Sequence, residues 1–317
     1  DALTATYTEN ANYTVTVVPG DFEITPAAAT VITVGDNDEP VTTYYGTLAE
    51  ALAAAKDGDT VQLLADVDEP AVAIENDITL DLNGHDWTVA PAEAGGTPGE
   101  VGIVAGVAVV DTATGGKGSI VGDIAVSDGG SLTLGGGAAA AAGSPSVGRV
   151  SVTGEGSTVS VEGGTVGGGV SVAEGGTGTI SGGTVNGTLA KDGDEGSSIS
   201  VSGGHFENDP SKPTDFVADG YVAVPGDPDG YDVIARQSIE GAVITIAENL
   251  TYTGLGQAGV TGVAVNGTNL VEGTDYVVVY ADNVNAGEAA ATVVGTNRWT
   301  GTIAGTTFAI AKAKLTV

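Results

Sequence analysis

Short runs of alternating apolar and hydroxyl residues recur through the middle of the chain, from Ile78 to Phe206, and pairs of glycines separate them. Alternation of period two places every second side chain on one face, as in a β-strand with one buried face. Three segments show a β run, a Gly-Gly corner and a second apolar position: residues 159–166, 178–185 and 198–206. Such a repeated unit predicts a parallel β-solenoid, in which each turn of the chain stacks on the preceding one.

One segment before the repeats has helical spacing. Thr47 and Glu50 are spaced as in a capping box, which predicts a helix over Leu48–Lys56. Its apolar face would consist of Leu48, Ala51, Leu52 and Ala55. We expect this short amphipathic helix to cover the first turn of the solenoid, whose stacking edge would otherwise expose unpaired backbone groups.

Alternation also marks the two ends of the chain. Tyr13–Val18 and Asp21–Pro26, joined by a Pro-Gly turn, predict a hairpin, and Leu3–Tyr7 predicts a further strand. An isolated hairpin is only marginally stable, so these strands need a partner. Residues 238–311 hold about seven alternating runs with turn signals between them, the pattern of a β-sandwich.

Composition narrows the function classes. The chain has 41 Asp and Glu residues against 9 Lys and Arg, a formal net charge of -32, which repels nucleic acid and anionic membrane surfaces. It has no cysteine, which excludes disulfides, iron–sulfur clusters and thiolate zinc sites. No apolar run approaches the ~20 residues of a membrane span, so we expect no membrane insertion.

Several motifs carry a resemblance to known families. The segments Tyr45–Leu52, Gly58–Leu64, Ile78–His85, Ser202–Phe206 and Val217–Val224 resemble the right-handed β-helix domains, of pectate-lyase-like architecture, in secreted bacterial surface proteins. The resemblance covers about residues 44–235.

A second resemblance concerns the two ends. Asn12–Pro26 resembles the closing strands of bacterial Ig-like repeats of the MBG type. Residues 238–311 resemble a complete repeat of this kind, through Tyr252–Gly254, Asn266–Leu270, Gly273–Tyr280 and Trp299–Gly301.

We therefore expect an all-β chain: a right-handed parallel β-helix with one short N-terminal capping helix, followed by an Ig-like β-sandwich. Residues 1–30 would be the terminal strands of an incomplete Ig-like unit, and residues 31–237 the β-helix, with its helix near 47–56. Residues 238–311 would form the sandwich, and residues 312–317 the first strand of a further or neighbouring unit.

The β-helix resemblance raises the question of polysaccharide cleavage. A lyase needs grouped acidic residues for calcium and an Arg or Lys base. In residues 78–206 the only such bases are Lys117, Arg149 and Lys191, each alone in a turn.

A hydrolase needs two carboxylates roughly 5 to 9.5 Å apart. Candidates are Asp111, Asp123, Asp128, Glu155, Glu162 and Glu174, but each lies near glycine, where we expect ordinary solvated turns. We assign no catalytic residue.

Metal and cofactor sites are not evident either. His85 and His205 are the only histidines, and we expect surface or packing roles for both. Acidic clusters occur at residues 36–39, 192–195 and 227–230. They could hold calcium, but solvated turns are the favoured interpretation, because none has the spacing of an EF-hand.

Two binding functions compete with a structural one. Ice binding would need a flat Thr-x-Thr ladder on every turn, and Thr177-Gly178-Thr179 has no evident echo one turn away. A glycan-binding or glycan-cleaving β-helix module would need aromatic rings on which sugars stack. The solenoid offers few: Trp87, Phe206 and Tyr221, all near its ends.

The sequence thus favours a structural segment of an extracellular bacterial surface protein, cell-surface or cell-wall associated: a stalk, an adhesin or a filament subunit. Its partners would be copies of itself or neighbouring Ig-like repeats, or a host or environmental glycan or protein. Terminal strands of successive copies could pair head to tail, making an open fibre. The alternative is that neighbouring repeats flank this segment. The strand residues available for self-association are Tyr13, Val15, Val17, Phe22, Ile24, Lys314, Leu315, Thr316 and Val317.

Overall fold

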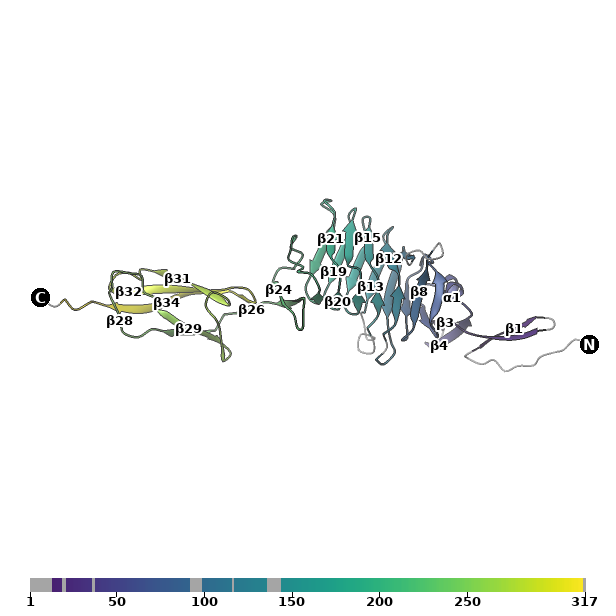
Figure 1. Cartoon of the computed structure of the whole chain (residues 1–317), viewed down its shortest axis with the longest axis horizontal. Coiled ribbons are helices and arrows are strands. Elements are labelled where there is room, and N and C mark those ends of the chain that lie inside the picture. The colour runs from purple at the N-terminus through teal and green to yellow at the C-terminus, as the bar shows by residue number, and fades with distance from the viewer. Residues whose placement is uncertain are drawn as a thin grey trace, which may run out of the picture. The chain divides into compact units, whose positions relative to one another are not determined.

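A computed structural model describes residues 13–18, 21–35, 38–91, 99–115, 117–135 and 144–315 (Figure 1). In these ranges the chain consists mostly of β-strands with a single helix, so the all-β expectation is confirmed. The chain divides into two compact units. Unit 1 is Asp1–Ala218 with Pro225–Val233, and unit 2 is Asp219–Val224 with Ile234–Val317.

Unit 1 is built on three sheets with long parallel stretches. Sheet I contains, in pairing order, β22 (Ser198–Val201), β19 (Thr177–Ile180), β16 (Thr158–Val161), β13 (Ser131–Leu134), β10 (Gly106–Val110), β7 (Ile78–Asp81), β5 (Thr60–Leu63), β3 (Ala29–Val34) and β4 (Pro40–Tyr45). Sheet II contains β25 (Tyr231–Ala235), β23 (His205–Phe206), β20 (Thr184–Val185), β17 (Thr165–Val166), β14 (Ser146–Val147), β11 (Ser119–Val121), β8 (Asp86–Ala90) and β6 (Val67–Pro70). Sheet III contains β21 (Leu189–Lys191), β18 (Val170–Ala173), β15 (Val150–Thr153), β12 (Asp123–Val126) and β9 (Glu100–Ile103). The strand β24 spans Tyr221–Pro225.

The chain visits the three sheets in rotation. From β10 to β20, each strand pairs in parallel with the strand three places later in the chain. The three segments singled out in the sequence are thereby stacked in register. The last apolar residue before each Gly-Gly corner forms a column of Val161, Ile180 and Val201. The first apolar residue after each corner forms a second column of Val166, Val185 and Phe206.

The interior of unit 1 is a set of these apolar columns. One runs through sheet II as Val67, Trp87, Ile120, Val147, Val166, Val185 and Phe206. All seven side chains are buried. Aliphatic residues suffice for most of such a core because each repeat buries its side chains against the next one.

The glycine corners have a conformational reason. The second glycine of each pair, at Gly164, Gly183 and Gly204, has φ of 73°, 74° and 98°, a region that L side chains rarely adopt. The chain therefore turns from sheet I to sheet II in the same way in successive repeats.

The helix α1 (Leu48–Ala54) begins where the sequence predicted, with the Thr47 Oγ1 accepting the Glu50 N–H at 3.1 Å. All four residues of its predicted apolar face are buried. It packs against β3, β4, β5 and β6. The helix thus packs on the first strands of unit 1, but the stacking edge of sheet I is paired by a strand, because β3 pairs antiparallel with β5 and β4 with β3. A strand can hydrogen-bond an open strand edge, whereas the side of a helix has no free backbone groups to offer.

The hairpin predicted near the N-terminus is present. The strands β1 (Tyr13–Val18) and β2 (Asp21–Pro26) form a two-stranded antiparallel sheet in which Val15 is opposite Ile24. The strand predicted at Leu3–Tyr7 lies outside the described residues.

Unit 2 contains two further sheets. Sheet IV is β28 (Leu250–Thr251), β34 (Thr302–Ala311), β32 (Gly287–Gly295) and β31 (Tyr276–Ala281), and sheet V is β27 (Val243–Ile246), β29 (Val260–Val265) and β30 (Thr268–Asn269). The short strands β26 (Gln237–Ser238) and β33 (Trp299–Thr300) pair with each other.

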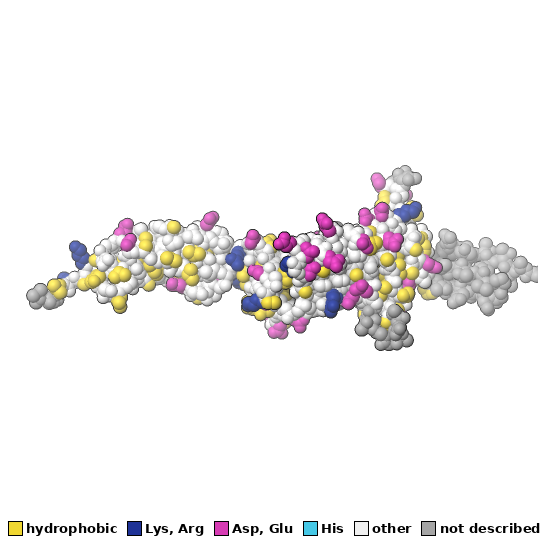
Figure 2. Space-filling view, turned by 90° about the horizontal axis from the view of Figure 1, so that it is seen from above, with side chains coloured by type: hydrophobic (Ala, Val, Ile, Leu, Met, Phe, Trp, Pro, Cys, Tyr) yellow, Lys and Arg dark blue, Asp and Glu magenta, His cyan; other side chains and the backbone are white. Residues whose placement is uncertain are grey.

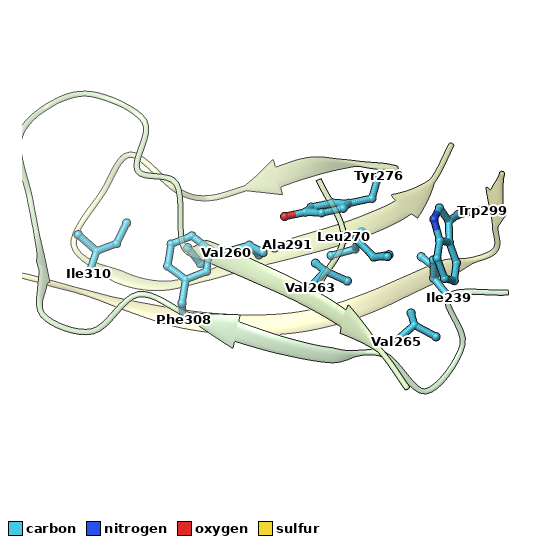
Figure 3. Packing of buried hydrophobic residues seen from close by; sticks show 12 residues of the cluster. Ile239, Val260, Val263, Val265, Leu270, Tyr276, Ala291, Trp299, Phe308 and Ile310 are labelled. Atoms are coloured by element: carbon cyan, nitrogen blue, oxygen red, sulfur yellow. The ribbon is translucent and has the colours of Figure 1, made fainter. Parts of the chain in front are cut away.

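The core of unit 2 includes Trp299, Phe308, Leu270 and Tyr276 (Figure 3). The Tyr280 ring meets Phe308 edge to face, with centroids 5.8 Å apart. The phenolic oxygen of Tyr280 accepts the Val260 N–H at 3.2 Å. The core of unit 2 thus combines three buried aromatic side chains, Tyr276, Trp299 and Phe308, with valine, isoleucine, leucine and alanine.

Candidate functional site

The outward faces of the parallel sheets carry regular columns of hydroxyl side chains. One column on sheet I is Thr60, Thr79, Ala108, Thr133, Ser160, Thr179 and Ser200. Beside it runs a second column of Gly106, Ser131, Thr158, Thr177 and Ser198. Thr177-Gly178-Thr179 is therefore flanked by hydroxyl pairs, Thr158 with Ser160 and Ser198 with Ser200, although neither neighbouring repeat holds a second Thr-x-Thr. Serine replaces threonine at several positions and the turns differ in length, and together these hid the register.

A similar column follows sheet II: Asp86, Ser119, Ser146, Thr165, Thr184, His205 and Asp232. The five members from Ser119 to His205 are half-buried. Parallel stacking brings equivalent side chains to within ~5 Å, so a charge in every repeat would be repelled by its neighbours. Hydroxyl residues avoid this repulsion, and threonine also has good β propensity.

Carboxylates are placed at the corners, where they accept backbone N–H groups of neighbouring repeats. Asp111 is only 1% exposed, and its oxygens accept the N–H groups of Gly84 at 2.9 Å, Ala113 at 3.1 Å and Gly118 at 2.8 Å. The interpretation of Asp111 as a solvated turn residue is therefore wrong. Nearby glycines signalled a turn, but they could not show that three N–H groups converge on the carboxylate.

Asp81 is a second buried carboxylate that sequence reasoning missed. It accepts hydrogen bonds from the Gln62 amide at 2.7 Å, from the Thr112 hydroxyl at 2.6 Å and from the backbone of Thr112 and Asn83 at 3.0 Å. The only available signal was a polar residue at the end of an apolar strand, Ile78–Asp81. Full hydrogen bonding makes both aspartates structural links between repeats.

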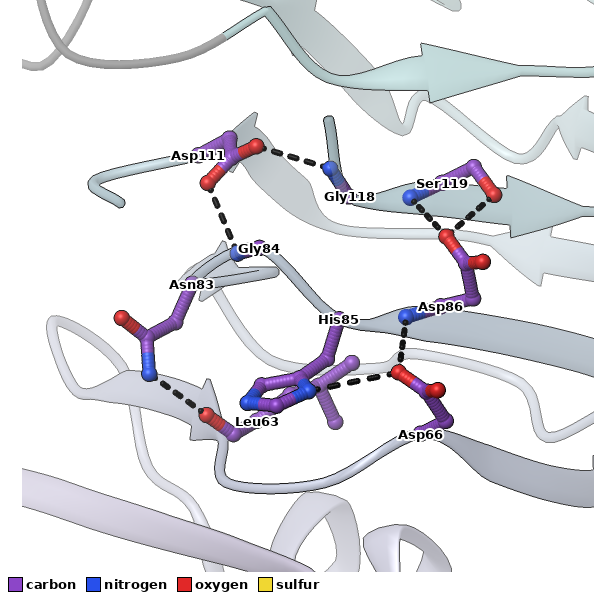
Figure 4. A network of polar contacts seen from close by, with 9 residues as sticks. All are labelled: Leu63, Asp66, Asn83, Gly84, His85, Asp86, Asp111, Gly118 and Ser119. Atoms are coloured by element: carbon purple, nitrogen blue, oxygen red, sulfur yellow. Dashed lines mark hydrogen bonds and ion pairs between the residues drawn. The ribbon is translucent and has the colours of Figure 1, made fainter. Parts of the chain in front are cut away.

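At the start of the sheet II column, four polar residues form a network (Figure 4). The Oδ1 atom of Asp66 accepts the Asp86 N–H at 3.1 Å and lies 3.2 Å from the His85 Nδ1. The Asp86 carboxylate in turn accepts the backbone and hydroxyl groups of Ser119 at 2.9 and 2.7 Å. The N–H of Asp86, followed by the hydrogen bond from His85, holds the pKa of Asp66 below its ordinary value.

The other histidine stands at the far end of the same column. The Nδ1 atom of His205 is 2.7 Å from the Asp232 carboxylate on β25. His205 also lines a cavity of about 420 Å³, together with Asn186, Glu207, Pro228, Asp229 and Gly230. Both histidines are half-buried and paired with aspartate, and they do not meet, because β8 and β23 are separated by four intervening strands of sheet II.

A second cavity lies on the same sheet. It has a volume of about 580 Å³ and is lined by Ser119–Asp123 and Ser146–Gly148. Ser119 and Ser146 belong to the hydroxyl column that leads, through Thr165 and Thr184, to His205. The face of sheet II between the two cavities is therefore a candidate for ligand contact in unit 1.

The other candidates from the sequence are dispersed. Asp123 is half-buried and accepts the Arg149 N–H at 2.8 Å. The remaining four hydrolase candidates are not fully buried and lie on turns or strand ends: Asp128, Glu155, Glu162 and Glu174. Lys117, Arg149 and Lys191 each lie in a different repeat. Trp87 and Phe206 are buried in the core, so neither ring can stack on a sugar.

The acidic cluster at residues 192–195 makes hydrogen bonds within its own turn and to the preceding repeat. Asp192 accepts the N–H groups of Glu174 and Asp194, and Asp194 accepts that of Gly196. Among the residues that the structure describes, no group of three or more His, Asp or Glu side chains is arranged to hold a metal ion. Part of the first cluster, residues 36–37, lies outside the described residues. Calcium binding stays a prediction.

The self-association residues fall in several places. Tyr13, Val15 and Val17 lie on β1, with Phe22 and Ile24 on β2. Lys314 and Leu315 follow β34 and are exposed, Leu315 at 89%. Thr316 and Val317 lie outside the described residues. In the described part of the chain β1 pairs only with β2. The structure therefore does not pair the residues near the N-terminus with those that follow β34 within one chain.

In the described part of the chain, no helix is both long and apolar enough to span a membrane. Comparisons with models of protein families, with curated proteins and with solved structures gave no match to this chain.

Proposed function

We propose that this chain is a structural segment of an extracellular bacterial surface protein: a right-handed parallel β-helix followed by an Ig-like β-sandwich, used as a stalk, adhesin or filament subunit. The observation that carries the proposal is the in-register stacking of unit 1, where strand after strand pairs with the one three places later. A stack of this kind gains length with each added repeat and keeps the same thin core.

The placement of polar groups supports the same conclusion. Outward columns are uncharged over most of their length, and carboxylates such as Asp81 and Asp111 connect successive repeats through backbone N–H groups. Buried, fully hydrogen-bonded links of this kind resist local opening. A net charge of -32 keeps such a surface soluble at a crowded exterior.

Head-to-tail assembly is the sharper form of this proposal. The hairpin β1–β2 is a separate two-stranded sheet among the described residues, and Leu315 after β34 is almost fully exposed. An isolated hairpin gains stability from a further strand. Pairing of one copy's residues 313–317 with the hairpin of the next would make an open, heterologous chain.

Electron microscopy of the purified chain over a range of concentrations, with and without calcium, tests the proposal. Filaments that disappear when residues 313–317 are deleted support head-to-tail assembly. Single stiff rods at every concentration exclude the filament subunit and leave a stalk or adhesin. Flexible or globular particles contradict the structural role altogether.

A second candidate is a glycan-binding or glycan-cleaving module, favoured by the two cavities on the face of sheet II. Glycan arrays and digestion assays test it. The variant Thr165→Lys changes the face of sheet II, and the control Thr179→Lys changes sheet I. Glycan binding that is lost in the first variant and kept in the second would support this candidate. Absence of binding and cleavage across neutral and acidic polysaccharides would count against it.

A further inference from the structure

Sheet IV of unit 2 ends at a strand that, among the described residues, has no partner strand on one side. The strand β31 pairs with β32 only, and an isolated bridge joins its first residue, Tyr276, to Glu272. Its sequence, YVVVYA, holds no charge, proline or glycine. Edge strands are usually protected by such residues, above all lysine and proline, so β31 is an open edge without the usual safeguards.

The side chains next to this edge are apolar as well. Val277 and Val279 point away from the core and are 40% and 60% exposed. Val294 and Thr292 lie opposite them on β32, and Ala281 is opposite Ala290. The outward surface beside the open edge is therefore a continuous patch of valine, alanine and threonine, which we term the β31 patch.

The charge distribution favours close approach of two copies at this patch. Residues 234–317 hold only six of the 41 Asp and Glu residues and four of the 9 Lys and Arg residues. On the face drawn in Figure 2, acidic side chains gather over unit 1, and hydrophobic side chains are prominent on unit 2. Two copies that meet through unit 1 would repel each other, whereas unit 2 is nearly neutral.

An occupant of this edge must supply a free strand edge and uncharged side chains, and β31 of another copy supplies both. We propose that β31 pairs antiparallel with β31 of a second copy, so that sheet IV continues across a two-fold axis. The interface is isologous, and it goes beyond the head-to-tail assembly proposed above, because it uses different strands.

The register follows from side-chain parity. Residues directly opposite each other in an antiparallel pair lie on the same face of the sheet. Val277, Val279 and Ala281 share the outward face, and Tyr276 is already bridged to Glu272. The free span is then 277–281, its centre is Val279, and Val279 of one copy lies opposite Val279 of the other.

The absence of cysteine from the chain makes this register testable. Val279→Cys introduces a single thiol, and Cβ atoms of directly opposite residues are ~4.5–5.5 Å apart. We expect this variant to form a covalent dimer under mild oxidation or with a short bis-maleimide. The matched control is Thr261→Cys, at an exposed position on β29, which has partner strands on both sides in sheet V and should stay monomeric at the same concentration.

Sedimentation equilibrium on the full chain tests the interface without a crosslink. We expect the wild-type chain to dimerise, and Val279→Lys to weaken the dimer by at least about tenfold, because like charges meet at the axis. Thr261→Lys, on the strand at the centre of sheet V, should leave dimerisation unchanged. Circular dichroism melts establish that each variant folds, and deletion of residues 313–317 should not affect this dimer, which separates it from head-to-tail filaments.

A wild-type chain that remains monomeric up to millimolar concentration would overturn the proposal. So would equal dimerisation of the wild-type and Val279→Lys chains, or equal crosslinking of the two cysteine variants.

Discussion

Gly118 donates its backbone N–H to the Asp111 carboxylate over 2.8 Å, in a corner where both residues are buried. The same carboxylate accepts the N–H of Gly84, from the preceding repeat. One side chain thus closes its own turn and connects it to the previous one. Substitutions at such corners should cost more stability than substitutions on the exposed strand faces.

Asp111→Asn should lower the free energy of unfolding by about 2 kcal/mol. The amide nitrogen of asparagine is a donor, so at least one of the three N–H groups that now meet the carboxylate loses its acceptor while buried. Urea denaturation followed by circular dichroism measures the loss. Glu155→Gln, at an exposed position, is the control and should change stability by less than about 0.5 kcal/mol. Equal losses in the two variants would contradict the role of Asp111.

Two buried glycines of unit 1 should respond differently to alanine. A Cβ at Gly203 would overlap the Ser181 carbonyl oxygen, so Gly203→Ala should cost about 2 kcal/mol or more. A Cβ at Gly178 meets only methyl and methylene groups, the nearest being Val172 Cγ2 at 3.3 Å. Gly178→Ala should change stability by less than about 1 kcal/mol, since reduced chain entropy offsets slight crowding. Thermal melts of both variants test the contrast, and a larger loss at Gly178 would refute it.

The pKa of Asp66 should lie below its ordinary value in a carboxyl NMR titration, because the Asp86 N–H and then His85 favour the ionised form. His85→Gln should raise this pKa only in part, since the Asp86 N–H remains. His205→Gln, at the other end of the column, should leave the titration of Asp66 unchanged.

The same shift fixes the sign of a pH dependence. A lowered folded-state pKa means that the contribution of Asp66 to stability is fully present above the unfolded pKa of ~3.9. It is lost as the pH falls through the lower pKa of the folded chain. If the contribution of Asp66 to the free energy of unfolding increased as the pH fell, the predicted sign would be contradicted.

Glu69 should stabilise the start of α1. Its carboxylate accepts the N–H groups of Leu48 at 2.8 Å and Ala49 at 3.0 Å, two donors that have no partner within the helix. Glu69→Ala should therefore cost about 1 kcal/mol. Asp68→Ala, at the exposed neighbouring position, is the control. Hydrogen exchange at the Leu48 and Ala49 amides should accelerate in the first variant alone.

The uncharged columns predict a coupling between neighbouring repeats. Thr165 and Thr184 are directly paired on sheet II. Replacing both with glutamate should cost about 0.5–1 kcal/mol more than the sum of the single substitutions. Combining Thr165→Glu with Thr184→Lys should reverse the sign of this coupling, because opposite charges then face each other. A double-mutant cycle without coupling in either case would remove electrostatic repulsion as the reason for the neutral columns.

The local elements of this fold could be predicted from the sequence, because they depend on near neighbours. Period-two alternation located the strands around Val161 and Val201, the Gly-Gly pairs located their corners, and the capping pair Thr47 and Glu50 located the helix start. These signals extend over only a few residues, so they do not require knowledge of which segments meet.

Tertiary structure decided everything that depends on register between distant segments. Thr177 meets Thr158 and Ser198 only because turns of unequal length still bring the strands into alignment. The burial of Asp111 and the antiparallel cover that β3 places on β5 likewise depend on backbone groups far away in the chain. Stacking energy is gained when a whole apolar column aligns, and that alignment, rather than any local pattern, determines which polar groups end up buried, paired or exposed.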